Sequence, residues 1–214
     1  MDSVETRQVS ESTTCLPVSV IVPVLNDAER IGDCLDALVS QSYPRDLVEI
    51  IVVDNGSTDD TRTIASRYPV TVVCETRGKS PYLARNTGIE RSLGEVIALT
   101  DATCTPVSDW IEQGIRALEE HSADLAGGRI AFTFSAERTA GESFDSISNL
   151  EMERNIRERG VAKTGNLFVR RRVFDSVGLF PAQVRSGGDV EWTGRATRAG
   201  FRMVYAPDAT VYKP

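Results

Sequence analysis

The sequence predicts an α/β fold in which a mostly parallel sheet is covered by helices on both faces. Two observations support this class. Apolar segments and amphipathic segments alternate four times between residues 17 and 121, and the apolar segments are continuous runs rich in Val and Ile. Strands that are buried on both faces have that composition, and successive parallel strands need helical crossovers between them.

The expected strands of this first part are short, apolar and bounded by turn residues, as buried strands are. They span residues 17–25, 48–54, 70–74 and 95–100. The first is followed by Asn26, the second ends in Asp54, and the fourth leads directly from four apolar residues and Thr100 into a carboxylate, Asp101. A buried strand that ends on a charge suggests that the charge has a function.

The expected helices carry apolar residues at helical spacing, and each has start and stop signals. They span residues 26–44, 56–68, 80–94 and 106–121. We expect Asn26 or Asp27 to cap the first helix, and Ser57 or Thr58 to cap the second, because these side chains accept hydrogen bonds from free helical N–H groups. Pro81 suits the first turn of the third helix.

The pattern weakens after residue 122, where we expect an elaboration packed on the first part. The predicted elements are one or two strands in 123–134, a helix in 142–159, a strand and short helix in 165–178, a helix in 189–200 and two short strands in 202–212. We therefore predict a flexible tail at 1–16 and one domain at 17–214, with a first half at 17–121 and a second half at 122–214.

Composition excludes several classes of function. The net charge of −7 argues against a nucleic-acid surface, which needs clustered Lys and Arg. The four cysteines are far apart and form no C-x-x-C pair, so a zinc site is not expected, and Cys34 and Cys74 fit small core positions. No apolar run approaches the length of a membrane span, which predicts a soluble, cytoplasmic chain.

Polar clusters follow three of the predicted strands, at 23–26, 54–57 and 101–103. The carboxyl ends of parallel strands meet in one crevice, where α/β proteins bind ligands. Each Asp could simply cap a helix, and for Asp54 that alternative stays open. Three such ends in one crevice favour a bound polar ligand.

Two nucleotide-binding motifs are absent. A dinucleotide fold needs G-x-G-x-x-G after its first strand, where this chain has P-V-L-N-D. The stretch RGKS at 77–80 lacks the upstream Gly of a P-loop and follows the third strand. We interpret Lys79 as a loop charge near a phosphate.

The motifs resemble those of the family 2 glycosyltransferases, which have the GT-A fold, a Rossmann-like arrangement with a smaller acceptor-side elaboration. The resemblance covers about residues 17–213. Six stretches carry it in order: VSVIVPVLND, VVDNGSTDDT, ARNTGI, TDATCTP, GNLFVRRRVFDSVGLFP and GGDVEWTGRATRAGFRMVYAPDATVYKP. Each is weak alone, but six at suitable spacing are specific.

The resemblance implies a nucleoside-diphosphate sugar as donor, and it places residues around it. Pro23 and Asn26 would line the nucleotide pocket. Asp54 would hydrogen-bond the base. Arg85, together with Arg77, would lie near the base or the diphosphate.

The family also binds Mg²⁺ or Mn²⁺ at this place, and here the chain departs from the pattern. Asp101 would bind the ribose side and the metal, but Thr103 stands where the second Asp of D-x-D belongs. Gly188 replaces the usual Glu, and Lys213 replaces a metal-binding His. The resemblance therefore implies a weak metal site, and we expect Lys213 to contact the diphosphate directly. An exposed position near the end of this sequence, with no contact to the donor, is an equal alternative for Lys213.

On the acceptor side, the resemblance implies that Asp189 is the general base. It would take the proton of the acceptor hydroxyl during a single displacement that inverts the anomeric centre. Asn166 belongs to the acceptor-side strand. Trp192 would stack on the acceptor sugar or wall the site, and a core position is an equal alternative.

The implied activity is sugar transfer to a glycan, lipid-linked or small-molecule acceptor, as in polysaccharide biosynthesis. Two alternatives stay open: a non-catalytic nucleotide-sugar-binding or regulatory domain, and the catalytic fragment of a longer membrane-associated enzyme. Longer family members continue into membrane or lipid-acceptor segments, so we also consider peripheral association with the inner membrane face through a C-terminal part beyond this sequence.

Overall fold

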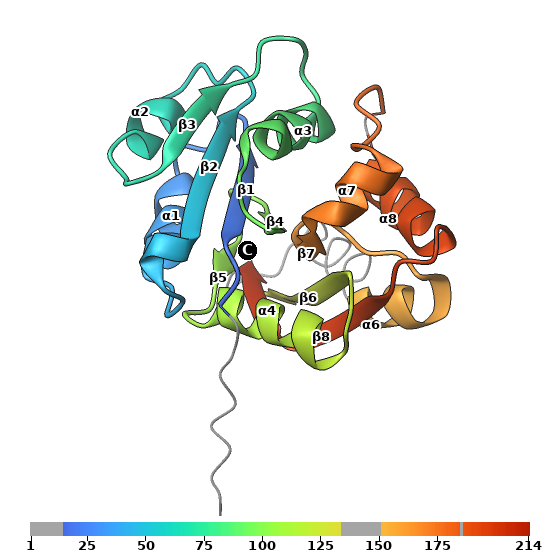
Figure 1. Ribbon diagram of the computed structural model, residues 1–214. Helices are drawn as coiled ribbons and strands as arrows, with labels where there is room; N and C mark the ends of the chain where they lie inside the picture. The colour runs from blue at the N-terminus through green and yellow to red at the C-terminus, as the bar shows by residue number, and fades with distance from the viewer. Residues whose placement is uncertain (1–14, 134–150, 185) are drawn as a thin grey trace, which may run out of the picture.

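The computed structural model describes residues 15–133, 151–184 and 186–214 of the chain. Within these ranges, eight strands form one sheet with helices on both sides (Figure 1). In their order across the sheet, the strands are β3 (Thr71–Cys74), β2 (Val48–Asp54), β1 (Val18–Val24), β4 (Val96–Thr100), β7 (Asn166–Arg170), β6 (Leu125–Phe132), β8 (Met203–Lys213) and β5 (Thr105–Pro106). The predicted α/β class is confirmed.

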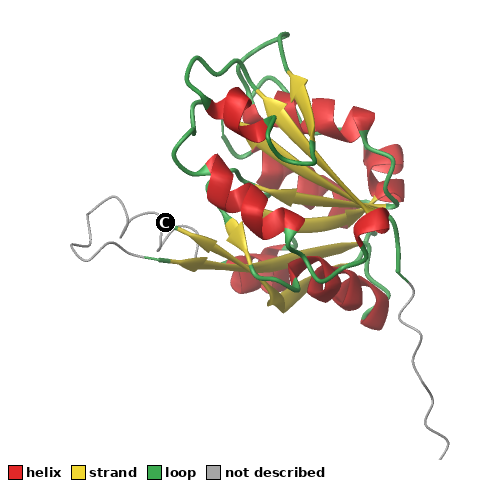
Figure 2. Cartoon of the chain, turned by 90° about the vertical axis from the view of Figure 1, so that its left-hand side faces the viewer, coloured by secondary structure: helices red, strands yellow, loops and turns green. Residues whose placement is uncertain are grey.

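The first four strands across the sheet are parallel, as their continuous apolar sequences predict. β7 is antiparallel to both of its neighbours, β4 and β6, while β8 is parallel to β6 and antiparallel to β5. Figure 2 shows the yellow strands passing between red helices. One sheet therefore runs through both halves of the sequence.

The helices begin and end as follows: α1 (Ile31–Val39), the 3₁₀ turn η1 (Arg45–Leu47), α2 (Thr61–Ala65), α3 (Pro81–Arg91), α4 (Trp110–Glu120), α6 (Met152–Arg154), the π-helical turn η2 (Asn155–Arg159), α7 (Arg171–Val177) and α8 (Gly188–Arg198). In Figure 1, α1 and α2 lie on one side of β1 and β2, and α3 lies on the other. The chain moves outward from β1 to β2 and β3 and then returns to β4 on the other side of β1. Crossovers between parallel strands are right-handed as a rule, so this change of direction puts α3 on the face opposite to α1 and α2.

The caps predicted for the first two helices are wrong. α1 begins only at Ile31, because Asn26 has a left-handed φ of 50° and its side chain accepts from Thr58 N (2.8 Å). Ser57 Oγ in turn accepts from Asn26 N (2.9 Å), so α2 starts later, after Asp60. The polar residues after β1 and β2 thus hold these two loops together.

Three other expectations need correction. The segment predicted as two short strands is the single strand β8, whose register shifts opposite Gly128 and Arg129. Cys74 is exposed because β3 is an edge strand, whereas Cys34 is buried as predicted. The short strand β5 was not predicted at all.

Two expectations fall wholly or partly outside the described residues. Of the predicted tail at 1–16, only Cys15 and Leu16 are described, and Leu16 N donates to the Tyr43 hydroxyl (2.7 Å). Of the helix predicted at 142–159, only the helical end after residue 150 is described. In the described parts of the chain, no helix is both long enough and apolar enough to span a membrane.

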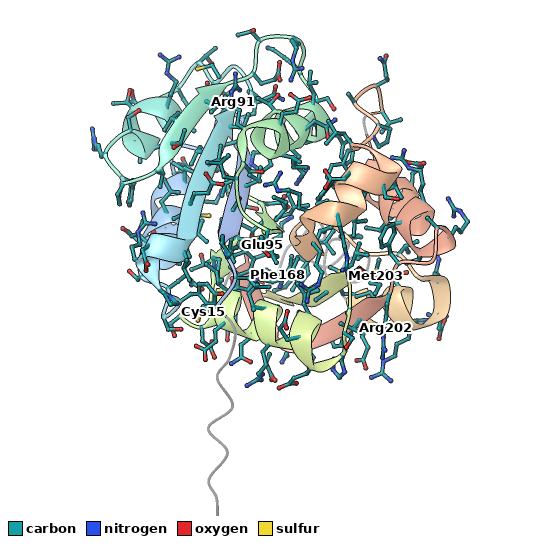
Figure 3. All side chains as sticks on the ribbon, viewed as in Figure 1. Cys15, Arg91, Glu95, Phe168, Arg202 and Met203 are labelled. Atoms are coloured by element: carbon teal, nitrogen blue, oxygen red, sulfur yellow. The ribbon has the colours of Figure 1, made fainter. Side chains whose placement is uncertain are left out.

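The core lies on both faces of the sheet. Phe168 of β7 is fully buried (Figure 3), and its ring centroid lies 4.7 Å from that of Trp110 on α4. Gly114 leaves room for this ring, since a Cβ at that position would overlap Phe168. Close packing here fixes α4 against the strands that carry the candidate site.

Candidate functional site

Two neighbouring cavities lie at the carboxyl ends of β1 and β4, where ligands bind in parallel α/β sheets. The first cavity has a volume of about 460 Å³ and the second about 510 Å³. Six of the residues predicted for the nucleotide-sugar site line the first cavity: Pro23, Asn26, Arg85, Asp101, Thr103 and Lys213. The candidate base Asp189 lines the second.

Asp101 lies where the two cavities meet, together with Arg85 and Lys213, and all three line both cavities. Arg85 Nη2 donates to Asp101 Oδ1 (2.5 Å), and Lys213 Nζ lies 3.8 Å from Asp101 Oδ2. We call these three residues the boundary triad. The carboxylate that follows β4 therefore has a cation at each of its two oxygens.

Local structure explains the placement of the triad. Asp101 directly follows β4, so it lies at the carboxyl end of that strand. In the turn that follows, Asp101 O accepts a hydrogen bond from Cys104 N (3.0 Å). Ser80 caps α3 and places Arg85 on its second turn, where Arg85 is buried with its guanidinium carbon 5.9 Å from the centre of the Tyr82 ring. Lys213 arrives from the end of β8.

The two buried thiols beside Asp101 are not nucleophiles. Burial is the main cause that raises the pKa of Cys104 to about 11, and burial likewise raises the pKa of Cys34 well above its usual value. Both thiols therefore stay protonated at neutral pH, and a protonated thiol is a poor nucleophile.

Asp189 is the second residue of α8 and faces the second cavity. Its Oδ1 accepts from the Tyr82 hydroxyl (3.2 Å) and from Val190 N (2.9 Å). Burial and then the charge of Asp189 raise the pKa of Tyr82, so the phenol remains a donor. A Cβ at Gly188 would lie 2.9 Å from Tyr82 Cε2, which explains why a Glu does not fit at this position beside Tyr82.

Two predicted donor-site residues do not line either cavity. Arg77 pairs with Glu75 (Nη2 to Oε2, 2.8 Å) and also lies 3.5 Å from Glu90, so its expected contact with the base or diphosphate is not supported. Asp54 is buried, and its Oδ1 accepts from Ser57 N (3.1 Å) in the turn after β2. The adjacent residue Asn55 lines the first cavity instead.

The two residues predicted for the acceptor side, Trp192 and Asn166, are both fully buried. Trp192 stacks on Phe174 (4.5 Å between ring centroids) and donates to Gly178 O (2.7 Å), so the core alternative holds. Asn166 donates to the carbonyls of Arg129 and Ala209 and accepts from Trp110 Nε1 (2.9 Å). It joins strands β7, β6 and β8 beneath the cavities.

Sequence reasoning missed Tyr82 and Lys163, which line the second cavity, and Arg30, which lines the first. Tyr82 is 107 residues from its partner Asp189, and no local pattern signals such a contact. Lys79, noted as a loop charge, does line the first cavity.

The residues at the boundary do not fit a divalent cation. Hard cations need several oxygen ligands, and among the described residues no group of three or more His, Cys, Asp or Glu side chains could hold one. Asp101 is a carboxylate that faces both cavities, and it already pairs with Arg85 and Lys213, whose positive charges would repel a metal ion.

Comparison with known proteins agrees with this geometry. The family model described as "Glycosyl transferase family 2" matches residues 19–178. The chain is 46% identical over 202 residues to Glycosyltransferase AglE of Haloferax volcanii, an alignment that covers 92% of this chain and 66% of AglE.

Solved structures share the fold. Mannosyltransferase PcManGT from Pyrobaculum calidifontis, solved in complex with GDP-Man and Mn²⁺, superposes with a TM-score of 0.73 at 25% identity, over 92% of this chain and 56% of that one. The S. aureus TarS structure also gives 0.73, at 19% identity, over 92% of this chain and 36% of TarS. The chain thus spans two thirds or less of the length of these relatives.

Proposed function

The chain belongs to glycosyl transferase family 2, and from that premise we propose that it transfers a sugar from a nucleoside-diphosphate sugar to an acceptor hydroxyl, with inversion at the anomeric carbon. The observation that carries the proposal is the boundary triad, which lies between two cavities that charged side chains line, with a carboxylate, Asp189, facing the second cavity. The complex of PcManGT with GDP-Man supports a donor of this class.

In this proposal the first cavity holds the donor nucleotide. Pro23, Asn26 and Thr103 line it near the strand ends, and Asn55 stands at the place for which we expected Asp54 to bind the base. Asp54 then acts on the base through the turn that it holds. The diphosphate lies toward the triad, so the sugar reaches the boundary between the cavities.

The second cavity holds the acceptor, which is a glycan, a lipid-linked saccharide or a small molecule. Asp189 takes the proton of the attacking hydroxyl, and the Tyr82 hydroxyl bond (3.2 Å) holds the carboxylate in place. Attack from the second cavity reaches the anomeric carbon on the face opposite the departing diphosphate. A single displacement of that kind inverts the anomeric centre.

The test begins with a thermal-shift screen of nucleotide sugars, because a ligand that binds only the folded state raises its melting temperature. Transfer is then measured with the stabilising donor for wild type and Asp189→Asn. Asn keeps the shape but cannot accept a proton, so we expect a rate loss of about 10²–10⁴ with donor affinity retained.

The matched control is Glu191→Gln, which alters an exposed carboxylate on the same helix that lines neither cavity. We expect it to transfer sugar at the wild-type rate. If Asp189→Asn also does so, the base lies elsewhere. If no nucleotide sugar stabilises the protein, the proposed function is wrong.

A further inference from the structure

The charge of the first cavity differs from the charge of the protein. The whole chain carries −7, yet the described residues that line this cavity include four cations (Arg30, Lys79, Arg85 and Lys213) and two carboxylates (Asp27 and Asp101). Both carboxylates are already ion-paired, Asp27 with Arg30 (2.7 Å) and Asp101 with Arg85. A positive cavity in an acidic protein favours an anionic ligand.

The boundary triad also has hydrogen-bonding capacity that its internal contacts do not use. Arg85 donates to Asp101 and, at 3.4 Å, to Pro81 O, but its buried Nε has no acceptor within the described part of the chain. A guanidinium has five N–H donors, so several remain for a bound anion. Lys213 is 28% exposed, and its ammonium lies at a long distance of 3.8 Å from the Asp101 carboxylate.

We infer that Arg85 and Lys213, oriented by Asp101, neutralise the diphosphate of the donor in place of a divalent cation, so that donor binding needs no metal. This inference rests on the proposed function. Asp101 keeps the two cations at the boundary while the site is empty, and it repels the incoming diphosphate less than an unpaired carboxylate would.

The chemistry explains why two cations belong at this place. The bond between the anomeric carbon and the β-phosphate oxygen breaks, and its electron pair stays on that oxygen. The acceptor oxygen forms the new bond to the anomeric carbon, and its proton passes to Asp189. Negative charge therefore grows on the departing diphosphate beside the triad, where preorganised donors stabilise it most.

The experiment measures binding instead of turnover. Calorimetry with UDP, GDP, ADP and CDP, each beside its nucleoside, is carried out in excess EDTA and again with added Mn²⁺ or Mg²⁺. In wild type we expect one diphosphate to bind equally well under all three conditions. Lys213→Gln should weaken the affinity for that diphosphate about 10- to 100-fold, which is the effect of losing one charge-assisted hydrogen bond. It should leave the affinity for the nucleoside unchanged.

Two further variants separate charge from structure. Lys213→Arg restores a cation and should restore most of the affinity. Arg116→Gln removes a cation that pairs with Asp208 (3.1 Å) away from both cavities, and it should bind like wild type.

The outcomes distinguish the inference from the function beneath it. Diphosphate binding that appears only with added Mn²⁺ or Mg²⁺ would overturn the inference and leave the proposed function standing. Equal binding by Lys213→Gln and wild type in EDTA would overturn it as well. If no nucleoside diphosphate binds under any condition, both are wrong.

Discussion

Two carboxylate–arginine pairs lie against the same helix, α3, and they differ in how completely each carboxylate is bonded. Glu75 follows β3 and pairs with Arg77, and both bond Thr87 of α3. Asp101 follows β4 and pairs with Arg85 of α3. Each pair joins one carboxylate to one arginine, and both carboxylates follow the carboxyl end of a parallel strand.

We call the first pair closed because its carboxylate is buried and saturated with hydrogen bonds. Glu75 accepts from Arg77 N, Nε and Nη2 and bonds Thr87 Oγ1, while its side chain is 1% exposed. The Arg77 hydrogen bonds are the main cause that lowers the pKa of Glu75 to about 2. Neither residue lines the two cavities.

The second pair is open. Asp101 is 29% exposed, faces both cavities and has one short and one long cationic contact, while Arg85 keeps an unused donor. The comparison teaches that the pairing of a carboxylate with an arginine does not by itself identify a site. A pair with unused donors next to a cavity can exchange a contact for a ligand, whereas a pair whose carboxylate is buried and saturated only stabilises the fold.

The largest expected difference between the pairs is in catalysis. Arg85→Gln should lower the transfer rate by about 10²–10³, because it removes a donor from the charge that develops on the diphosphate. Arg77→Gln, the same change in the closed pair, should leave the rate per folded molecule unchanged. The measurement is initial rate divided by the folded fraction from circular dichroism, and equal losses in the two variants would contradict the distinction.

The next difference is in stability at neutral pH. Glu75→Gln should lower the free energy of unfolding by about 1–3 kcal/mol, because an amide nitrogen would face the Arg77 donors inside a buried cluster. Asp101→Asn should cost less, since its oxygen still accepts from Arg85 and water reaches the site through both cavities. Urea unfolding of both variants measures this, and a larger loss for Asp101→Asn would reverse our assignment.

The smallest expected effect is the dependence of stability on acid. The folded pKa of Glu75, about 2, lies below its ordinary value of 4.5, so its contribution is present above pH 4.5 and is lost as the pH falls toward 2. Other carboxylates titrate in the same range, so the quantity to compare is wild type minus Glu75→Gln. That difference should shrink between pH 5 and pH 3, and a constant difference would show that the pKa of Glu75 is not lowered.

Most of the parallel half of the fold follows from the sequence. The ranges expected for β1, β2, β3 and β4 agree with the structure to within a residue or two, because buried parallel strands are short continuous runs of Val and Ile. The helix caps failed because Asn26, Ser57 and Thr58 bond one another between loops. A side chain that suits a cap can equally serve a tertiary contact, and local sequence does not separate the two uses.

The sequence motifs were also enough to identify the family. They predicted six residues of the first cavity, because residues at the carboxyl ends of parallel strands lie together at one end of the sheet. Three-dimensional packing alone decided the rest: the insertion of β7 beside β4, the burial of Trp192 and Asn166, and the meeting of Tyr82 with Asp189. Packing also left the Asp101 carboxylate partly exposed beside the cavities and buried the Glu75 carboxylate. Such differences depend on which distant segments cover a side chain. The topology and close packing of the whole chain decide this, and a short stretch of sequence does not contain that information.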